Sequence, residues 1–208
     1  MTDAKDKTSI GRRDLMKGAG LAGATALASP LAKAEPMPND VTADQIREAL
    51  KLEPNQTCGF VRNTYKSALS IAPGGLPAPF AAGRPLGTAL YFMMTPEAPV
   101  KLHRIMNDQL YHYYLGDPIE LRLLYTSGAT ERVVIGPDVL GGQHVQFFIP
   151  GGTFHTARIS GARRWFLGGS TEWPGVDVTK DVELGDAEAL AAKYPAAAAD
   201  LRAFPQPA

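Results

Sequence analysis

The feature that most constrains the fold of this chain is a series of short runs of β-branched and aromatic residues, interrupted by turn-forming residues such as Gly and Pro. Runs of this length and composition predict strands. Ser127-Gly128-Ala129 has the composition of a hairpin turn between two of them. Many short strands with close turns are typical of an all-β sandwich or barrel. We expect strands at 88–94, 100–105, 109–115, 119–126, 131–135, 145–149, 155–159 and 164–170.

Helical patterns are confined to the two ends of this strand series. Thr42 and the glutamine three residues later form a capping box, which predicts a short helix over 42–51. Two alanine-rich segments, 186–194 and 196–204, predict helices after the last strand. The stretch 71–85 is rich in Pro and Gly and predicts a long loop, of the length that often carries function.

The first 34 residues have the features of an export signal. Arg12 and Arg13 stand in a basic run, a weakly apolar stretch rich in Ala and Gly follows, and a small-x-small cleavage site ends at Ala34. This order is typical of a twin-arginine signal peptide. The alternative is an internal helix that begins with two arginines. We expect a signal peptide at 1–34, a spacer at 35–41 and a periplasmic or otherwise exported protein.

Composition narrows the partners of the mature chain. Without the leader, 174 of the 208 residues remain, the size of one domain. They hold 15 of the 21 basic and 18 of the 21 acidic residues, a net charge of −3, so we expect no nucleic-acid partner. No apolar run after the leader is long enough to cross a bilayer, and we expect no membrane partner after cleavage. Cys58 has no second cysteine to pair with, which favours a buried, inert thiol.

Two segments stand out chemically, the His- and Tyr-rich stretch 103–118 and the stretch 150–155. The second reads P-x-G-x-x-H and ends at His155. Both segments resemble the two signature motifs of the cupins, which are small jelly-roll barrels. In that comparison Gly116 matches the glycine of the first motif, and Gln109 takes the position of its glutamate.

The resemblance is strongest to one branch of the cupins, the family of the domain of unknown function 985. That branch has a pattern similar to His-Arg followed by His-Tyr-Tyr-x-Gly-Asp-Pro. It implies an all-β cupin jelly-roll barrel with short flanking helices, a cupin domain at 42–195 and a C-terminal helical tail at 196–208. The matching segments are 102–121, 59–65, 134–138 and the tail that begins with 174–177 and ends with 194–195.

The departures from the cupin pattern concern metal binding. A metal-binding cupin uses two histidines one residue apart, a glutamate and a third histidine, but here the first histidine position is Lys101 and the glutamate position is Gln109. His103, Gln109 and His155 remain as an alternative metal set, without negative charge. Lys101 would also repel a cation at close range. The cofactor therefore stays open between none and a divalent metal, and we favour none.

Strand alternation indicates which of these side chains face the barrel. Lys101, His103 and Ile105 are expected on one face. Gln109, Tyr111 and Tyr113 are likewise expected on one face, so that His112 points away from the pocket.

The expected pocket is polar and has aromatic walls, which suits a small sugar-like or carboxylated metabolite. His103 and Tyr113 are the candidate catalytic acid/base pair, an arrangement similar to that of cupin-fold sugar epimerases. The candidate ligand-binding residues are Lys101, Gln109, Tyr111, His155 and Arg62. A metal-dependent cupin enzyme and a non-catalytic periplasmic binding module are the alternatives. A small barrel with edge strands also predicts a homodimer.

Export can be tested directly. If Arg12 and Arg13 form a twin-arginine signal, replacing both by lysine should leave the precursor in the cytoplasm, because that export route reads the arginine pair. Cell fractionation would measure this, and wild-type chain should give a mature N-terminus at Glu35. Normal export of the double variant would contradict the prediction.

Overall fold

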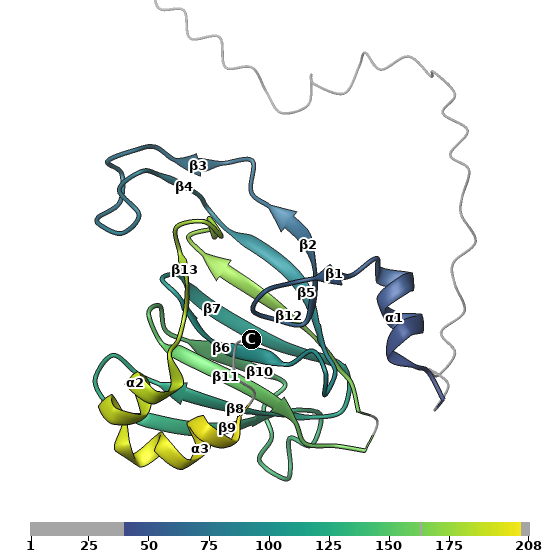
Figure 1. Cartoon of the computed structure of the whole chain (residues 1–208). Coiled ribbons are helices and arrows are strands. Elements are labelled where there is room, and N and C mark those ends of the chain that lie inside the picture. Colours follow the sequence, from purple (N-terminus) through teal and green to yellow (C-terminus); the bar gives the residue numbers. More distant parts are fainter. Residues whose placement is uncertain (1–39, 163, 205–208) are drawn as a thin grey trace, which may run out of the picture. The chain divides into compact units, whose positions relative to one another are not determined.

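The alternation of inward and outward side chains along the strands places two antiparallel sheets face to face (Figure 1). Residues 40–162 and 164–204 are described in this computed structural model. The expected leader at 1–34 and most of the spacer lie outside the described residues. In order across it, the six-stranded sheet A consists of β1 (Glu53–Pro54), β2 (Phe60–Lys66), β5 (Thr88–Met94), β12 (Phe166–Trp173), β7 (Asp108–Gly116) and β10 (Gln146–Ile149).

The five-stranded sheet B packs its inner face against sheet A. The apolar core between them takes Phe92, Tyr111 and Phe166 from sheet A and Leu121 and Ile135 from sheet B, all with at most 1% of their surface exposed. Burial of these side chains is the main stabilising term of the barrel. In order across it, sheet B consists of β13 (Val182–Leu184), β6 (Val100–Ile105), β11 (Phe154–Ile159), β8 (Ile119–Leu124) and β9 (Thr130–Ile135).

A β-bulge interrupts the alternation of β6. Val100 pairs with Ala157 of β11 and His103 pairs with His155, so β6 uses three steps where β11 uses two. Val100 and His103 consequently both face the barrel interior, the first in the core and the second in the cavity described below. The expectation that Lys101 shares the face of His103 is therefore not met, because the extra residue of the bulge displaces it.

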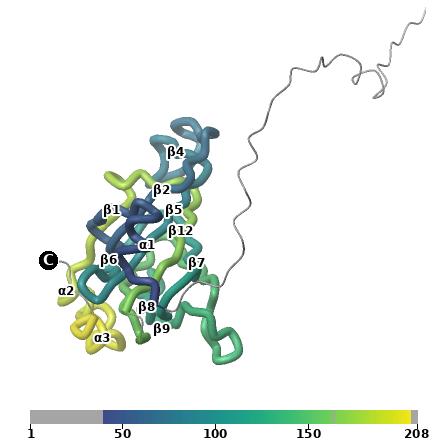
Figure 2. The backbone as a smooth tube through the Cα atoms, turned by 90° about the vertical axis from the view of Figure 1, so that its right-hand side faces the viewer, coloured from purple at the N-terminus to yellow at the C-terminus, as the bar shows by residue number. Residues whose placement is uncertain are grey.

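Helix α1 (Ala43–Leu50) begins where the sequence predicts it. The hydroxyl of Thr42 accepts from the backbone N–H of Gln45, and the Gln45 side chain accepts from the backbone N–H of Thr42. This reciprocal pair is the predicted capping box. The helix adjoins β1 (Figure 2).

The C-terminal helices cover the outer face of sheet B (Figure 1). They are α2 (Ala187–Lys193), the short 3-10 helix η2 (Pro195–Ala197) and α3 (Ala198–Ala203). Leu190 and Leu201 pack with Leu102 of β6 and Phe154 of β11 in a second apolar cluster. The predicted helical tail is thus packed against the barrel as far as it is described, to Phe204.

A hairpin arm stands at one end of the barrel (Figures 1 and 2). Its base is the pair of two-residue strands β3 (Ser70–Ile71) and β4 (Arg84–Pro85), which bracket the long loop expected at 71–85. Residues Gly83, Arg84 and Pro85 of this arm reach the wall of the cavity.

The all-β jelly-roll architecture expected from the sequence is confirmed. The expected strands 88–94 and 100–105 are β5 and β6 with the same bounds. Sequence analysis does not predict β2, because its run FVRNTYK is polar and most of its side chains are exposed. It also ends the last expected strand at 170, whereas β12 continues to Trp173.

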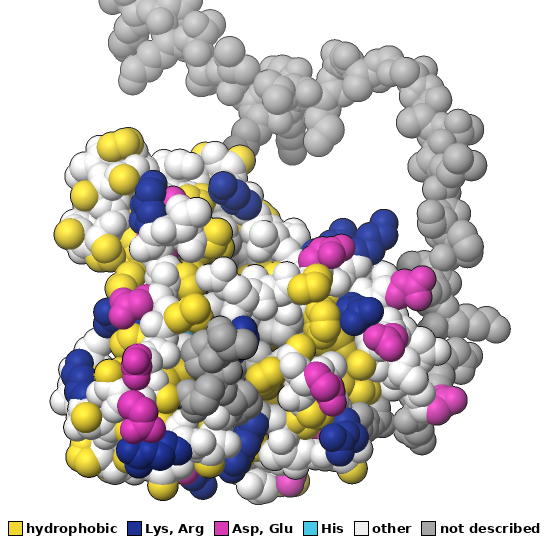
Figure 3. Space-filling view, in the orientation of Figure 1, with side chains coloured by type: hydrophobic (Ala, Val, Ile, Leu, Met, Phe, Trp, Pro, Cys, Tyr) yellow, Lys and Arg dark blue, Asp and Glu magenta, His cyan; other side chains and the backbone are white. Residues whose placement is uncertain are grey.

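The surface facing the viewer in Figure 3 has Lys and Arg side chains interspersed with Asp and Glu. On the C-terminal helices, Arg202 and Glu188 form a salt bridge at 2.9 Å. Within residues 40–162 and 164–204, no helix is long and apolar enough to cross a membrane.

The docking of α3 can be tested by truncating its buried anchor. Leu201→Ala should lower the free energy of unfolding by about 3 kcal/mol, because Leu201 has none of its surface exposed and packs into the second cluster. Arg202→Ala on the exposed side of the same helix is the control, and its loss should be much smaller than that of Leu201→Ala. Denaturant unfolding would measure both, and equal losses would show that α3 is not docked.

Candidate functional site

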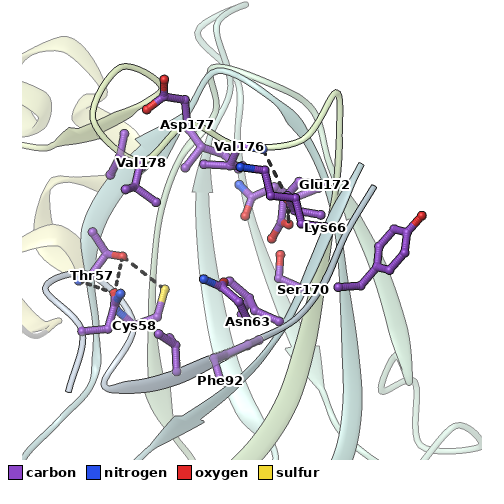
Figure 4. Close-up of a pocket in the computed structure, with 18 of the residues that line it drawn as sticks. Thr57, Cys58, Asn63, Lys66, Phe92, Ser170, Glu172, Val176, Asp177 and Val178 are labelled. Carbon is purple, nitrogen blue, oxygen red and sulfur yellow. Dashed lines mark hydrogen bonds between the residues drawn. The ribbon is translucent and has the colours of Figure 1, made fainter. Parts of the chain in front are cut away.

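A cavity of about 540 Å³ lies between the sheets, within the range typical of small-molecule sites. Its walls come from the inner faces of β2, β5, β12 and β7 in sheet A and from β6 and β13 in sheet B. Figure 4 shows Thr57 and Cys58 on one side of it and Ser170 and Glu172 on the other. The exposed lining residues Lys66 and Val178 mark the end that opens to solvent. The polar lining groups include Cys58, Asn63, His103, Gln109, Ser170 and Glu172, and the apolar ones include Leu90, Phe92, Ile105 and Val182.

His103 presents an unprotonated ring nitrogen on the sheet B side of this cavity. Its Nδ1 lies 2.8 Å from the backbone carbonyl of Lys101, which can only accept, so we assign the proton to Nδ1. Nε2 is then an acceptor, 3.9 Å from the Sγ of Cys58. Burial lowers the pKa of His103 to about 4. The ring is therefore neutral near pH 7.

Cys58 is a thiol in the wall of the cavity. The hydroxyl of Thr57 lies 3.5 Å from its Sγ. Burial raises the pKa of Cys58 to about 11, although the neighbouring Thr57 and Tyr111 side chains oppose this rise. A thiol with so high a pKa is a poor nucleophile at neutral pH, in agreement with the inert cysteine that the sequence favours.

His155 lies behind the cavity wall. Its Nδ1 donates to the carbonyl of Thr153 at 3.2 Å, and its Nε2 accepts from the hydroxyl of Tyr111 at 3.0 Å. The His155 and His103 rings lie with their centroids 4.3 Å apart. Burial and then the neighbouring His103 keep the pKa of His155 well below its usual range. Tyr111 lines the cavity and thus connects it to His155.

Glu172 places a buried carboxyl on the sheet A side. It pairs in register with Gln109 of β7 and Thr88 of β5, and 3% of its surface is exposed. The Thr88 hydroxyl donates to Glu172 Oε2 at 2.7 Å. Burial raises the pKa of Glu172, and hydrogen bonds to its carboxylate partly offset that rise. In the described part of the chain, no Lys, Arg or His forms a salt bridge with it.

Sequence reasoning misses Glu172 because it ends the last strand at Ser170, three residues before the end of β12. Alternation from the inward-facing Ser170 would have placed Glu172 on the same face. The Ser170 Oγ is buried and completes no hydrogen bond with the described residues, although it lies close enough to Glu172 to lower the pKa of that carboxyl.

The structure brings only part of the expected set together. His103, Gln109 and Tyr111 line the cavity, and Lys101, Tyr113 and Arg62 do not. The Tyr113 hydroxyl donates to the Gly116 carbonyl at 2.8 Å, and its ring packs against the core.

Arg62 and Lys101 are directed elsewhere for separate reasons. Arg62 is exposed, and its Nη1 donates to the Leu50 carbonyl at 2.9 Å. Lys101 lies in the bulged part of β6, where its backbone N–H donates to the Thr57 carbonyl at 2.8 Å.

His112 is on the other face of β7, as alternation predicts, and does not line the cavity. Its Nε2 lies 3.1 Å from Thr171 Oγ1, and its Nδ1 lies 3.1 Å from Gln146 Nε2. It is half-buried, and burial lowers its pKa. Both partners come from the strands that flank β7 in sheet A.

Arg84 is the buried cation of the cavity, and its charge is balanced. Its guanidinium donates to both carboxylate oxygens of Asp181, at 2.9 and 2.6 Å, and neither side chain is more than 3% exposed. The hydrogen bond with Asp181 raises the pKa of Arg84. This bidentate pair joins the hairpin arm to the segment before β13 and fixes one side of the open end.

Comparison with known proteins agrees with this architecture. The family described as "Cupin_5: Cupin superfamily (DUF985)" matches residues 44–184. The chain belongs to this family. A hypothetical protein from Leishmania major is similar in structure, with 25% identity and a TM-score of 0.72 over 80% of this chain and 99% of that one. A Shewanella oneidensis protein gives 25% identity and a TM-score of 0.69 over 81% and 99%. A search of curated proteins found no match.

The ligand set left open for a metal in this cupin does not fit a divalent cation. The Nε2 of His155 already accepts from Tyr111, and Gln109 brings no charge. Among residues 40–162 and 164–204, no group of three or more His, Cys, Asp or Glu side chains is placed to hold a metal ion.

Proposed function

We propose that this cupin binds a small sugar-like or carboxylated metabolite in its barrel cavity and supports metal-independent acid/base chemistry on it. The observation that carries the proposal is the pair of titratable groups on opposite walls. His103 and Glu172 both face the cavity from different sheets, and neither has a salt-bridge partner in the described residues.

The two groups suit different roles. Burial shifts the pKa of Glu172 upward, towards neutral pH. A carboxyl with a raised pKa is better suited to give and take a proton in catalysis. His103 remains neutral at physiological pH, so its Nε2, which lies 3.9 Å from the Cys58 thiol, is an acceptor that a ligand hydroxyl would share with that thiol or take over. This proposal replaces Tyr113 by Glu172 as the partner of His103, because the Tyr113 hydroxyl is directed to the Gly116 carbonyl.

A non-catalytic binding module would use the same cavity groups without proton transfer. Turnover separates the two cases. Exchange of ligand C–H protons for solvent deuterium, followed by NMR on a panel of sugars and sugar acids, would detect epimerase-like chemistry. The absence of exchange with a ligand that binds would favour the binding module.

Substitution of His103, together with removal of metal ions, tests both the role of the cavity and the metal-dependent alternative. Treatment with EDTA should leave the melting temperature unchanged, because no group of three or more His, Cys, Asp or Glu side chains among the described residues is placed to bind a metal ion that EDTA could remove. His103→Ala should remain folded and bind panel ligands about tenfold more weakly or worse. His112→Ala, on the outer face of the same sheet as Glu172, is the matched control and should bind like wild type. A stoichiometric metal that survives dialysis, coordinated by His103 and His155, would overturn the metal-independent proposal.

We also propose that the mature protein is exported, which the replacement of Arg12 and Arg13 by lysine tests. We further propose that it forms a homodimer. Edge strand β10 supports the dimer, because Phe148 on it is 50% exposed and Tyr114 on the neighbouring β7 is 43% exposed. Light scattering at micromolar concentration should give twice the protomer mass. A mass of one protomer would contradict the dimer.

A further inference from the structure

We propose that the cavity selects uncharged polyhydroxylated ligands of monosaccharide type over carboxylates, and that Glu172 makes this selection. The inference rests on the proposed function and narrows its ligand class. The same cavity was open to both classes on the sequence alone.

Among the described residues that line the cavity, no buried cation is left unpaired for a ligand carboxylate. The guanidinium of Arg84 is already paired with both oxygens of Asp181. The remaining lining cation, Lys66, is exposed at the open end. Asp177 also lines the cavity, and its carboxylate is paired with Lys180 at 3.2 Å; Figure 4 shows Asp177 and Lys66 on different sides of the cavity.

Glu172 makes the interior unfavourable to a second negative charge. It is 3% exposed and without a salt bridge among the described residues, and a ligand carboxylate would meet its charge in a poorly hydrated space. Like charges repel strongly where water cannot screen them. A carboxylate could bind only with a proton on Glu172 and would therefore bind less well as the pH rises.

The uncharged groups of the cavity fit hydroxyls. Gln109 has 3% of its surface exposed. The Ser170 Oγ is buried and completes no hydrogen bond with the described residues. Amides and hydroxyls both donate and accept, as sugar hydroxyls do, and the acceptor Nε2 of His103 matches a hydroxyl donor. Phe92 and Leu90 supply an apolar wall for the carbon face of a ring.

The other titratable groups of the cavity keep their charge between about pH 5 and about pH 8, so they do not contribute to a pH dependence of ligand binding in this range. The pKa of His103 is about 4 and that of Cys58 about 11, so neither changes charge in this window. Burial raises the pKa of Tyr111 well above its usual range, and the pKa of Asp177 is lowered to about 2 by hydrogen bonds from Thr179. Among the described residues, the other charged groups at the cavity are Lys66, the Arg84–Asp181 pair and Lys180, which pairs with Asp177.

The experiment compares glucose, galactose and mannose with the matching hexuronates by calorimetry on the mature protein. Wild type should bind at least one hexose at about pH 8 and its uronate at least about tenfold more weakly. As the pH is lowered and Glu172 takes up a proton, the uronate should gain affinity while the hexose does not. Glu172→Gln should narrow the difference at high pH to less than about threefold and remove its pH dependence. Glu183→Gln, which removes an exposed carboxylate that pairs with Arg104 outside the cavity, should behave like wild type.

Each outcome decides the inference. Equal or stronger binding of a uronate by wild type at high pH would overturn the selection and leave the proposed binding function standing. Binding of neither class would overturn both together. If Glu172→Gln does not fold, the pH dependence of wild type alone decides, and a uronate affinity that does not change with pH would refute the role of Glu172.

Discussion

The pairing of β12 with β5 on one side and β7 on the other is the constraint on which the cavity depends. Register places Glu172 between Thr88 and Gln109, and Ser170 between Leu90 and Tyr111. Because inward-facing residues recur every two positions, these neighbouring rows line the cavity with polar groups. Farther along the same strands, Phe92 and Phe166 close the barrel with apolar packing. A shift of one residue in β12 would turn Glu172 to the outside.

The two buried histidines illustrate how the backbone sets the chemistry of side chains. Carbonyls of Lys101 and Thr153 hold the Nδ1 protons of His103 and His155, which leaves both Nε2 atoms as acceptors. The Nε2 of His103 lies 3.9 Å from the Cys58 thiol at the cavity wall, and the Nε2 of His155 accepts from Tyr111. Their lowered pKa values follow from burial, so both rings remain neutral where a surface histidine would begin to titrate. A neutral imidazole that accepts a hydrogen bond suits a ligand hydroxyl, whereas a protonated imidazole would suit an anionic ligand.

Much of the fold follows from local sequence signals, but the site follows only in part. Strands at 88–94 and 100–105 and the cap at Thr42 could be predicted, because apolar runs and capping boxes act over neighbouring residues. Lys101 was misplaced, because a bulge forms only when β6 pairs with β11. Glu172 was missed, because nothing local marks how far β12 extends beside its two partners.

The sequence by itself determined the jelly-roll class, the family, and the presence of His103, Gln109 and Tyr111 on strands that face inward, since these depend on residue type and short-range spacing. Tertiary structure alone decided which titratable groups share the cavity. It brought Glu172 opposite His103 and paired Arg84 with Asp181 across 97 positions of the chain. Such meetings depend on strand order, register and burial, which arise only when distant segments pack together and exclude water from between them.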